Sequence, residues 1–576
     1  MSAADLFSLN LINNFLVSTC REMGIAMMRT AFSPIFNEGL DFSCVIFTRD
    51  GEMIAQADYV PSMVGSILYT VKWTIEELGL DYFHEGDVII HNDPYRGGCH
   101  LPEHMFLKPV FYDGDLVGFV ATIGHITEIG GKAIGGFAAD ATDVFQEGLR
   151  IPPIRIVNRG ELVEDVWKLV LNNHRTPRNT WGDFHAMIGS LRTGEQRVQQ
   201  LLKRHGKSYV ESTMEGLLQY AEQYMRAEIR SIPNGEYTFE DMIEDDGVEP
   251  DRSYRIRATL IVDDDQILVD FTGSSPQATG AINCTFGVTA SATYNALLQV
   301  TDASIPRNAG CYRPIRLIAP AGTVVNVSYP GPEVGGNSEI HGRIVDLLLA
   351  ALWQAIPKRV AASSGGSSMN FLFGGGHPDT GATYAGYHFE GVGYGGQDER
   401  DGMHVVSELG GNCRNTPVEI FESRYPWRVL RYSLAPDSGG PGLHRGGCGS
   451  ERVLEVCAPR ITVSAVIDRL RQPPYGLSGG REGGCAQILI KRSGEHAFRS
   501  FRDVFGTAAA GKFSGIVLHQ GDQVLLRSPG GGGYGNPRQR PRELVIEDLR
   551  EGLISVETAA KFYGSADDAS SNEGVT

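Results

Sequence analysis

The sequence predicts an α+β protein with several domains, and three observations support this fold class. The chain has 576 residues, of which 42% are hydrophobic and 21% are charged, which is enough for several hydrophobic cores. Segments with helical periodicity alternate with short apolar strand patterns over much of its first part. The 71 glycines are concentrated late in the chain, which indicates loop-rich β structure because glycine adopts positive φ and lets backbones approach closely.

The N-terminal part alternates between helix and strand signals. Apolar positions in residues 6–32 recur with the helical period and are interrupted by polar residues, which predicts an amphipathic helix. Residues 41–55 predict a hairpin, because two apolar runs flank the turn formed by Asp50 and Gly51. Further patterns predict a helix over residues 60–78 and strands over residues 87–91 and 116–125.

The chain then divides into a helical segment and a C-terminal half dominated by strands. Charged residues within 160–228 are expected to form solvated helix faces. From residue 235 strands and helices mix, and short strands punctuated by Gly and Pro follow. A tail rich in Ser, Asp and Gly from residue 564 is expected to be disordered. The expected regions are 1–160 (α+β), 161–232 (helical), 233–360 (α+β), 361–540 (Gly-rich and mainly β) and 541–576 (C-terminal helix and tail).

Charge and cysteine content exclude several classes of protein. The formal net charge is −18, and no patch rich in Lys and Arg is visible, so we expect no nucleic-acid partner. The N-terminal residues show no positively charged leader and no uninterrupted apolar run, so we expect no membrane span and a cytoplasmic location. The nine cysteines are scattered and never form a Cys-x-x-Cys pair, so we expect neither a disulfide framework nor a zinc ribbon.

The densest group of candidate metal ligands lies in a loop rich in Gly and Pro that follows a predicted strand. Pro102 disfavours a helix there, so His100 and Glu103 are expected to converge through a tight turn. His125 ends a predicted strand downstream, and Asp41 begins the first hairpin strand. Two imidazoles and two carboxylates suit Zn, Mn or Fe and leave room for a water molecule. Spacing alone leaves another interpretation open, because a histidine of this kind is more often a hydrogen-bonded loop or core residue.

Residues 92–102 read Asn-Asp-Pro-Tyr-Arg-Gly-Gly-Cys-His-Leu-Pro. This stretch resembles the motif Asn-Asp-Pro-Tyr-x-Gly-Gly-Thr-His-Leu-Pro-Asp of the hydantoinase B/oxoprolinase family. Further matching stretches follow in the family's order, so that the resemblance covers nearly the whole chain. These stretches begin at Phe145, Asp270, Gly335, Arg414, Pro436 and Ser528.

The resemblance implies a metal site and assigns its ligands residue by residue. In related lactamases and acetone carboxylases the metal is held by an acidic residue of the first hairpin, a His, an acidic residue shortly after it and a second His further on. The matching positions here are Asp41, His100, Glu103 and His125. We therefore expect the N-terminal α+β region, residues 1–160, to be the metal-binding region.

Three positions depart from the family pattern. Glu103 replaces the more usual Asp and lengthens the carboxylate arm by one methylene. Cys99 replaces a usual Thr, and Ile126 stands where a second His is common. These departures bear on substrate preference through the surroundings of the metal. Cys99 itself is expected to be a bystander thiol, because neighbours in an extended segment point in opposite directions.

The resemblance also implies an ATP-dependent enzyme with two components. Family members hydrolyse ATP on a different, actin-like subunit, which phosphorylates the substrate oxygen. We therefore expect a hydantoinase A-like ATPase subunit as partner in a hetero-oligomer, with ATP and Mg bound on that partner. Residues 530–533 are a glycine run without the Lys-Ser/Thr pair of a phosphate-binding loop, so the sequence indicates no nucleotide site in this chain.

The leading hypothesis is hydrolysis of a small cyclic amide such as a hydantoin, 5-oxoproline or a lactam. One divalent transition metal would lower the pKa of its water to about 7 and supply the nucleophile. Glu128 is the candidate catalytic residue for proton handling. Asn337 and Glu339 are candidate substrate contacts at a helix N-terminus, and a plain glycine turn is an equal alternative there. The alternatives for the whole chain are a subunit of a ketone carboxylase of the acetone or acetophenone type and a scaffolding subunit.

Overall fold

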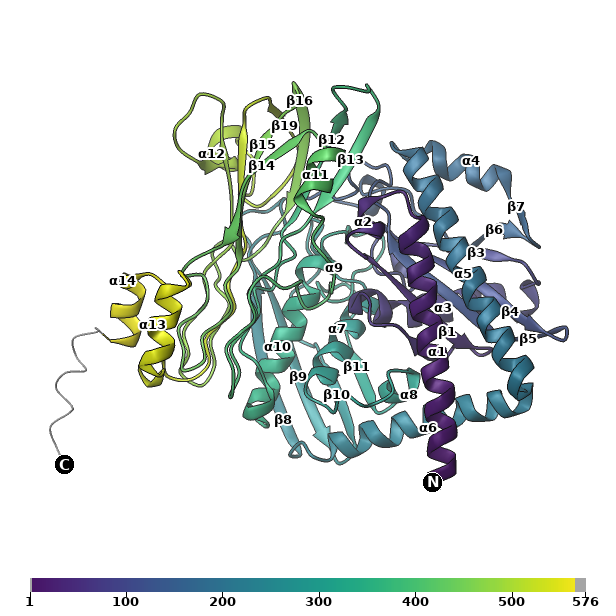
Figure 1. Ribbon diagram of the computed structural model, residues 1–576. Coiled ribbons are helices and arrows are strands. Elements are labelled where there is room, and N and C mark those ends of the chain that lie inside the picture. The colour runs from purple at the N-terminus through teal and green to yellow at the C-terminus, as the bar shows by residue number, and fades with distance from the viewer. Residues whose placement is uncertain (1–2, 565–576) are drawn as a thin grey trace, which may run out of the picture.

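A computed structural model describes residues 3–564, which form four sheets and the helices that flank them (Figure 1). The largest sheet has seven strands in the order β2-β1-β5-β4-β3-β6-β7. All its neighbouring strands pair antiparallel. The strands are β1 (Phe42–Thr48), β2 (Met53–Gln56), β3 (Val88–His91), β4 (Glu103–Tyr112), β5 (Asp115–His125), β6 (Ile154–Asn158) and β7 (Glu161–Leu162).

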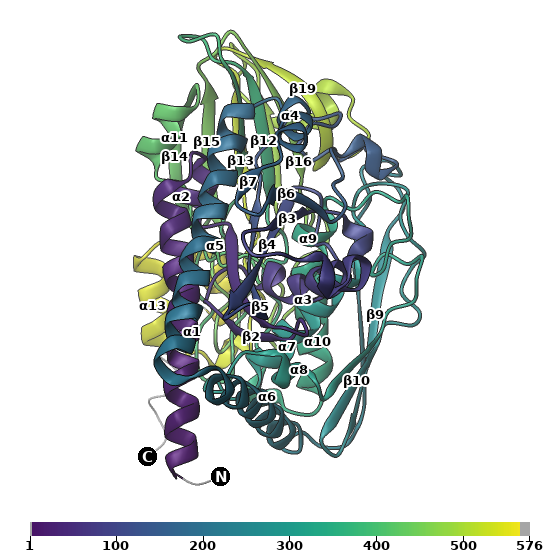
Figure 2. The same ribbon diagram turned by 90° about the vertical axis from the view of Figure 1, so that its right-hand side faces the viewer.

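Both faces of this seven-stranded sheet are covered by helices. Val45 of β1 belongs to the hydrophobic core shared with α3 (Pro61–Leu78). Its neighbour Cys44 belongs to the opposite core, under α1 (Ala3–Thr30) and α5 (Pro177–His205), because successive side chains of a strand point to opposite faces. The two long helices α1 and α5 lie side by side (Figure 2). Burial on both faces explains why the central strands are almost continuously apolar in sequence.

A second sheet of four strands, in the order β11-β10-β9-β8, has one buried face. Along β9 (Tyr254–Asp263) buried and more exposed residues alternate, as expected for a sheet that faces solvent on one side. The other strands are β8 (Gly235–Ile243), β10 (Gln266–Asp270) and β11 (Ile315–Ile318). Helix α10 (His341–Trp353) packs on β8 and β9, and α6 (Lys207–Ile229) contacts β10. The other helices in this part of the chain are α7 (Phe286–Gln299), α8 (Ala309–Tyr312) and α9 (Gly336–Glu339).

The C-terminal half forms two further sheets around a shared hydrophobic core. The first has the order β13-β12-β16-β19, with β12 (Asn370–Gly376), β13 (Thr383–His388), β16 (Arg460–Val466) and β19 (Lys512–His519). The second has the order β14-β15-β20-β17-β18, with β14 (Trp427–Leu434), β15 (Ser450–Val456), β17 (Gln487–Lys491), β18 (Arg499–Ser500) and β20 (Gln523–Arg527). Short helices interrupt this half, namely α11 (Val418–Arg424), α12 (Phe501–Phe505), α13 (Arg542–Arg550) and α14 (Val556–Thr558).

The glycine runs of the C-terminal half are packed backbone against backbone. The N–H of Gly531 donates to the carbonyl of Gly447, and that of Gly393 donates to the carbonyl of Pro529. A Cβ added to Gly393 would lie 1.9 Å from the Gly447 carbonyl oxygen. These extended segments run outside the named strands (Figure 1). The expectation that glycine is used here for close backbone approach is therefore confirmed.

The α+β class is confirmed, and most of the expected elements are present, but one central strand was not expected. No strand was expected over β4, which carries Pro109 and the ionisable side chains of Glu103 and Lys108. The strand is stable because it is held between β5 and β3, and Lys108 pairs with Glu195 at 3.2 Å. The polar residues interrupt the pattern of apolar residues by which a strand is recognised in the sequence. The tail expected to be disordered falls mainly on residues 565–576, outside the described residues.

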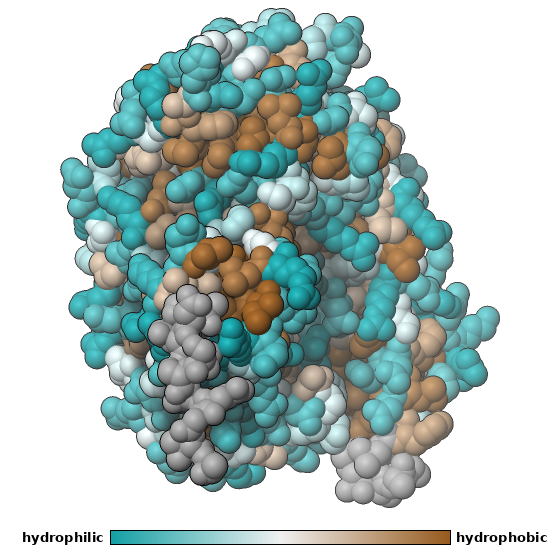
Figure 3. Space-filling view, turned by 60° about the vertical axis from the view of Figure 1, so that its left-hand side comes forward, coloured by the Kyte–Doolittle hydropathy of each residue, from teal (hydrophilic) through white to brown (hydrophobic). Residues whose placement is uncertain are grey.

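Most of the face that Figure 3 shows is hydrophilic. On the face that carries the C-terminal helices, hydrophobic residues form separate areas and the surface is hollowed beside them (Figure 3). Among residues 3–564, no helix combines the length and the hydropathy needed to cross a membrane.

Candidate metal centre

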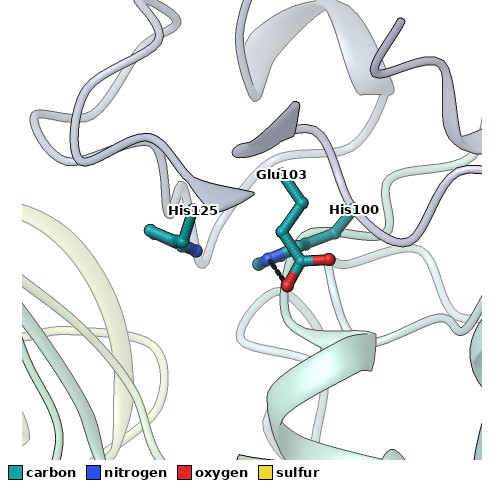
Figure 4. A group of neighbouring side chains, drawn as sticks. All are labelled: His100, Glu103 and His125. Carbon is teal, nitrogen blue, oxygen red and sulfur yellow. Dashed lines mark ion pairs between the residues drawn. The ribbon is translucent and has the colours of Figure 1, made fainter. Parts of the chain in front are cut away.

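Three candidate ligands meet at one end of the β4–β5 pair. The antiparallel register places Glu103, at the start of β4, opposite His125, at the end of β5. His100 precedes β4 in a tight turn, in which the N–H of Glu103 donates to the carbonyl of His100. The ligand atoms of the three residues all lie within 4.8 Å of one another, and their side chains point toward a common centre (Figure 4). The tight turn expected from Pro102 is therefore present.

The three side chains are buried, and each keeps one atom without a hydrogen bond. Their exposed fractions are 1% for His100, 3% for Glu103 and 2% for His125. His100 Nε2 lies 3.2 Å from Glu103 Oε1. The Nε2 atoms of both histidines and Oε2 of Glu103 have no hydrogen-bond partner among the described residues. Buried polar atoms without partners are costly, and a divalent cation would satisfy all three at once, so these residues fit a metal ion.

The ring of His100 is oriented from outside the cluster. Its Nδ1 lies 2.9 Å from the carbonyl oxygen of Val334. A carbonyl can only accept, so Nδ1 carries the proton and Nε2 is left as the free lone pair. Glu147 Oε1 in turn accepts hydrogen bonds from the N–H groups of Glu333 and Val334. The segment before α9 is thereby held in the position that selects this tautomer.

The ring of His125 is held by aromatic packing. It stacks on Tyr387 with a centroid separation of 4.7 Å and lies beside Phe137 at 5.7 Å. Burial, and then the neighbouring His100 and His104, hold the pKa of His125 well below its ordinary value. His125 is therefore neutral at physiological pH, which is the state in which an imidazole binds a metal ion.

Asp41 lines the same cavity but lies outside the tight group of three. Its backbone carbonyl accepts a hydrogen bond from the N–H of His125, which ties the start of β1 to the end of β5. Burial and the nearby Glu103 raise the pKa of Asp41 to about 7, and His100 and Cys413 partly oppose this increase. Ligation by Asp41 stays a prediction, and a bound cation would favour its charged form.

The two candidate substrate contacts lie in different places. Asn337 lines the cavity, and its Nδ2 donates to Glu103 Oε1 at 3.0 Å while its Oδ1 has no partner among the described residues. Glu339 is fully buried and does not line the cavity. Its carboxylate accepts hydrogen bonds from Asn370 Nδ2 and from the N–H of Asp468. The geometry brings Asn337 to the candidate metal centre and leaves Glu339 behind it.

Glu128 does not line the cavity either. Its buried carboxylate accepts hydrogen bonds from the N–H groups of Gly130 and Gly135 and pairs with Arg175 at 3.0 Å. These contacts position the loop that follows β5. Proton handling by Glu128 stays a prediction to which this placement lends no support. Cys99 is buried and is also absent from the cavity lining.

The cavity over the three ligands is small, about 40 Å³, and residues of the C-terminal half complete it. Glu390 is one of them, and it accepts hydrogen bonds from His388 and Arg452. Burial opposes its ionisation, but Arg452 and His388 outweigh this effect and lower the pKa of Glu390 to about 2. Sequence reasoning missed the wall residues Tyr387, Glu390, Glu408 and Cys413, because they lie hundreds of positions from the ligands and no spacing connects them.

Comparisons with known proteins show the family and the fold of this chain. The family model described as hydantoinase B/oxoprolinase matches residues 5–537. The B-type component of a putative D-/L-hydantoinase from Pseudomonas sp. (strain NS671) is 33% identical over 97% of this chain and 95% of its own length. The crystal structure of ATP-dependent caprolactamase from Pseudomonas jessenii superposes with a TM-score of 0.90 at 31% identity, covering 98% of this chain and 96% of that chain. A nucleotide-free acetone carboxylase shares the fold, with a TM-score of 0.89 at 19% identity over 97% of this chain and 79% of that chain.

Proposed function

This chain belongs to the hydantoinase B/oxoprolinase family, and from that premise we propose that it is the metal-dependent hydrolytic subunit of an ATP-dependent cyclic amidase. The proposed substrates are hydantoins, 5-oxoproline or lactams. Support comes from relatives named as a component of a putative hydantoinase and as an ATP-dependent caprolactamase, both of which align over almost the whole chain.

The observation that carries the proposal is the set of three unpartnered ligand atoms buried around one cavity. His100, Glu103 and His125 offer two imidazole nitrogens and a carboxylate oxygen, a donor set that suits Zn, Mn or Fe. Asp41 is the proposed fourth ligand. A divalent cation held there would act as a Lewis acid and lower the pKa of water to about 7.

The residues around the ligands have complementary tasks in this proposal. Val334 keeps His100 in the tautomer that presents Nε2. Asn337 Nδ2 restrains Glu103 Oε1, and the unpartnered Oδ1 of Asn337 could accept the N–H of a cyclic amide. Tyr387 and Phe137 pack around His125 and exclude water from that side of the cavity.

ATP use is assigned to a partner of the hydantoinase A type, in a hetero-oligomer. This chain has no Walker-type Lys-Ser/Thr loop. An unstrained amide carbonyl is a poor electrophile, so phosphorylation of its oxygen by the partner and delivery to this site would divide one large barrier between two steps. We expect calorimetric titration of the isolated chain with Mg-ATP to show no saturable heat. A micromolar dissociation constant would contradict this assignment.

The test of the reaction is reconstitution of both subunits with hydantoin, 5-oxoproline, caprolactam and acetophenone, each with and without bicarbonate. Mass spectrometry should show ATP-dependent ring opening without a bicarbonate requirement, and the product should disappear in the Asp41→Ala and His100→Ala proteins.

A ketone carboxylase subunit is the second candidate, favoured by the similarity of its fold to acetone carboxylase. It predicts bicarbonate-dependent gain of a carboxyl group by the ketone. That result in the reconstituted complex would replace the amidase proposal.

A further inference from the structure

A second, larger hollow adjoins the candidate metal centre. It has a volume of about 680 Å³ and is bordered by α7, α10 and the segment that leads to Cys413. This volume is in the range of small-molecule sites, whereas the cavity over the ligands measures only about 40 Å³. Ser407, Glu408 and Cys413 line both spaces. A substrate that reaches the ligands from the hollow must therefore pass these three residues.

Glu408 is the acidic residue at this junction, and its carboxyl group is held on one side only. Oε2 accepts a hydrogen bond from the N–H of Gly410 at 2.8 Å. Oε1 receives no hydrogen bond from any of the described residues. A Cβ placed on Gly342 would lie 2.9 Å from Oε2, so the carboxyl group fits because position 342 carries no side chain. The fold thus fixes one oxygen and leaves the other free.

The groups that face Glu408 do not neutralise it. His341 Nδ1 and Glu408 Oε1 both approach Gly410, at 2.6 Å and 2.9 Å from the position of an added Cβ, and neither ring nitrogen of His341 has a hydrogen-bond partner among the described residues. Burial lowers the pKa of His341 to about 3, so it is neutral. The charged groups that act on Glu408 are Asp346 and Asp41, and both are acidic and raise its pKa. Burial raises the pKa of Glu408 to about 8, with the hydrogen bond from Gly410 opposing, so it holds a proton at neutral pH.

The other carboxylic acids that line the small cavity already have a partner or a proposed role as a metal ligand. Glu103 belongs to the group of three ligands, and Asp41 is the proposed fourth. Glu390 is an anion because Arg452 and His388 bind it. Glu408 is thus the acid in this cavity with a free oxygen and no assigned partner for it.

We propose that Glu408 donates the proton to the ring nitrogen when the cyclic amide opens, an inference that rests on the proposed function. The oxygen of a water molecule bonds to the carbon of the O-phosphorylated amide, the π electron pair of the C=N bond moves to the ring nitrogen, and the nitrogen takes a proton from Glu408 Oε1. The carboxylate takes up one proton of the added water, so the acid is restored. The C–N bond then breaks with its electron pair going to nitrogen, the hydroxyl left on the carbon becomes the carbonyl, and its proton passes to nitrogen through Glu408. The phosphorylated oxygen stays on the carbon as an acyl phosphate, which a second water hydrolyses to carboxylate and phosphate.

The Glu408→Gln protein tests this role, because glutamine keeps the acceptor for Gly410 and removes the acid. In the reconstituted complex we expect kcat for ring opening to fall by about 10²- to 10⁴-fold, with KM and metal content unchanged. Glu419→Gln is the matched control, because Glu419 is exposed on α11 and does not line the cavity. Glu408→Asp keeps an acid and should retain more activity than Glu408→Gln.

A comparison of leaving groups separates proton donation from a structural role. An amine leaving from a lactam needs a proton more than the ureido nitrogen of a hydantoin, so the loss in Glu408→Gln should be larger with the lactam. Equal losses for both, loss of metal, or activity like that of the wild type would overturn the role of Glu408. If the wild-type complex opens no cyclic amide, the proposed function itself is wrong. If the wild-type complex opens the ring and one of the results above is found for Glu408→Gln, only the role of Glu408 is wrong. If Glu408→Gln does not fold, Glu408→Asp decides, and an inactive, folded, metal-bound Glu408→Asp protein also overturns the proposal.

Discussion

The seven-stranded sheet and the glycine-rich segments of the C-terminal half are packed by opposite means. The sheet is filled by large side chains on both faces, such as Phe106 on one side and Phe119 on the other. The glycine segments touch through their backbones, with Gly447 and Gly531 in direct hydrogen-bonded contact. The sheet positions the ligands, and the C-terminal half closes the cavity over them with Tyr387 and Glu408. A substitution should therefore destabilise the seven-stranded sheet when it removes side-chain atoms and leaves a cavity. In the glycine segments it should destabilise the protein when it adds atoms that clash with the neighbouring backbone.

The largest effect is expected from one added methyl group in the glycine segments. A Cβ on Gly530 would lie 1.8 Å from the carbonyl oxygen of Ser438, and backbone cannot move away as a side chain can. We expect Gly530→Ala to lose more than about 3 kcal/mol of unfolding free energy, at or beyond the usual cost of overpacking, measured by chemical denaturation. Gly376→Ala is the control, because no atom of the part of the chain that the structure describes lies within 4 Å of its added Cβ. Similar stabilities of the two proteins would contradict the comparison.

The next effect concerns a single side chain removed from the end of the sheet. We expect His125→Ala to lose most of its bound transition metal, because each ligand contributes a large share of a site's affinity. His104→Asn is the control, since His104 follows Glu103 in β4 and packs against Phe184 on the other face. Elemental analysis should find metal in the control and little in His125→Ala. Equal metal content in both would refute the ligand assignment.

Acidification should weaken the N-terminal sheet region before the C-terminal sheets. Burial and the nearby Arg96 lower the pKa of His91 to about 3. Burial and the nearby His104 lower the pKa of His174 to about 3 as well. The unfolded chain therefore binds more protons below about pH 6.5, and stability falls as the pH drops toward 3. At pH 5 each histidine should cost roughly 2 kcal/mol.

Hydrogen exchange at pH 7 and pH 5, corrected for intrinsic rates, would measure this difference between the regions. In the C-terminal sheets burial and Arg452 lower the pKa of His388, and Glu390, at 2.8 Å from its Nε2, opposes this effect. His174→Leu should remove part of the acid sensitivity of the N-terminal region. Equal loss of hydrogen-exchange protection in both regions would show that the buried histidines do not cause the acid sensitivity of the N-terminal region.

The smallest effect is expected at Glu128, and it distinguishes a loop contact from a catalytic role. Glu128→Gln weakens the pair with the half-buried Arg175 and keeps an acceptor for Gly130. We expect a loss of about 1 kcal/mol in stability, with metal content and ring-opening rate close to those of the wild type. A 100-fold loss of kcat with unchanged stability would instead support the proton-handling role.

Sequence reasoning succeeded where the signal is local. The period of α1, the turn at Asp50 and Gly51, and the apolar run of β5 are all encoded within a few residues, because helix and strand periodicity depends on neighbours in the chain. β4 was missed because Glu103 and Lys108 are stabilised by partners on other elements. The motif around His100 identified the family because it is a contiguous stretch.

The sequence by itself determined the α+β class, the family and the residue types that can hold a metal ion. Only the tertiary structure decided which of them meet, because the register of β4 against β5 brings Glu103 to His125. It also placed Asn337 at the cavity and turned Glu128 toward Arg175. Contacts between residues hundreds of positions apart leave no period or spacing in the sequence. For that reason nothing in the sequence indicated that Glu408 lines the cavity, and only the tertiary structure shows it.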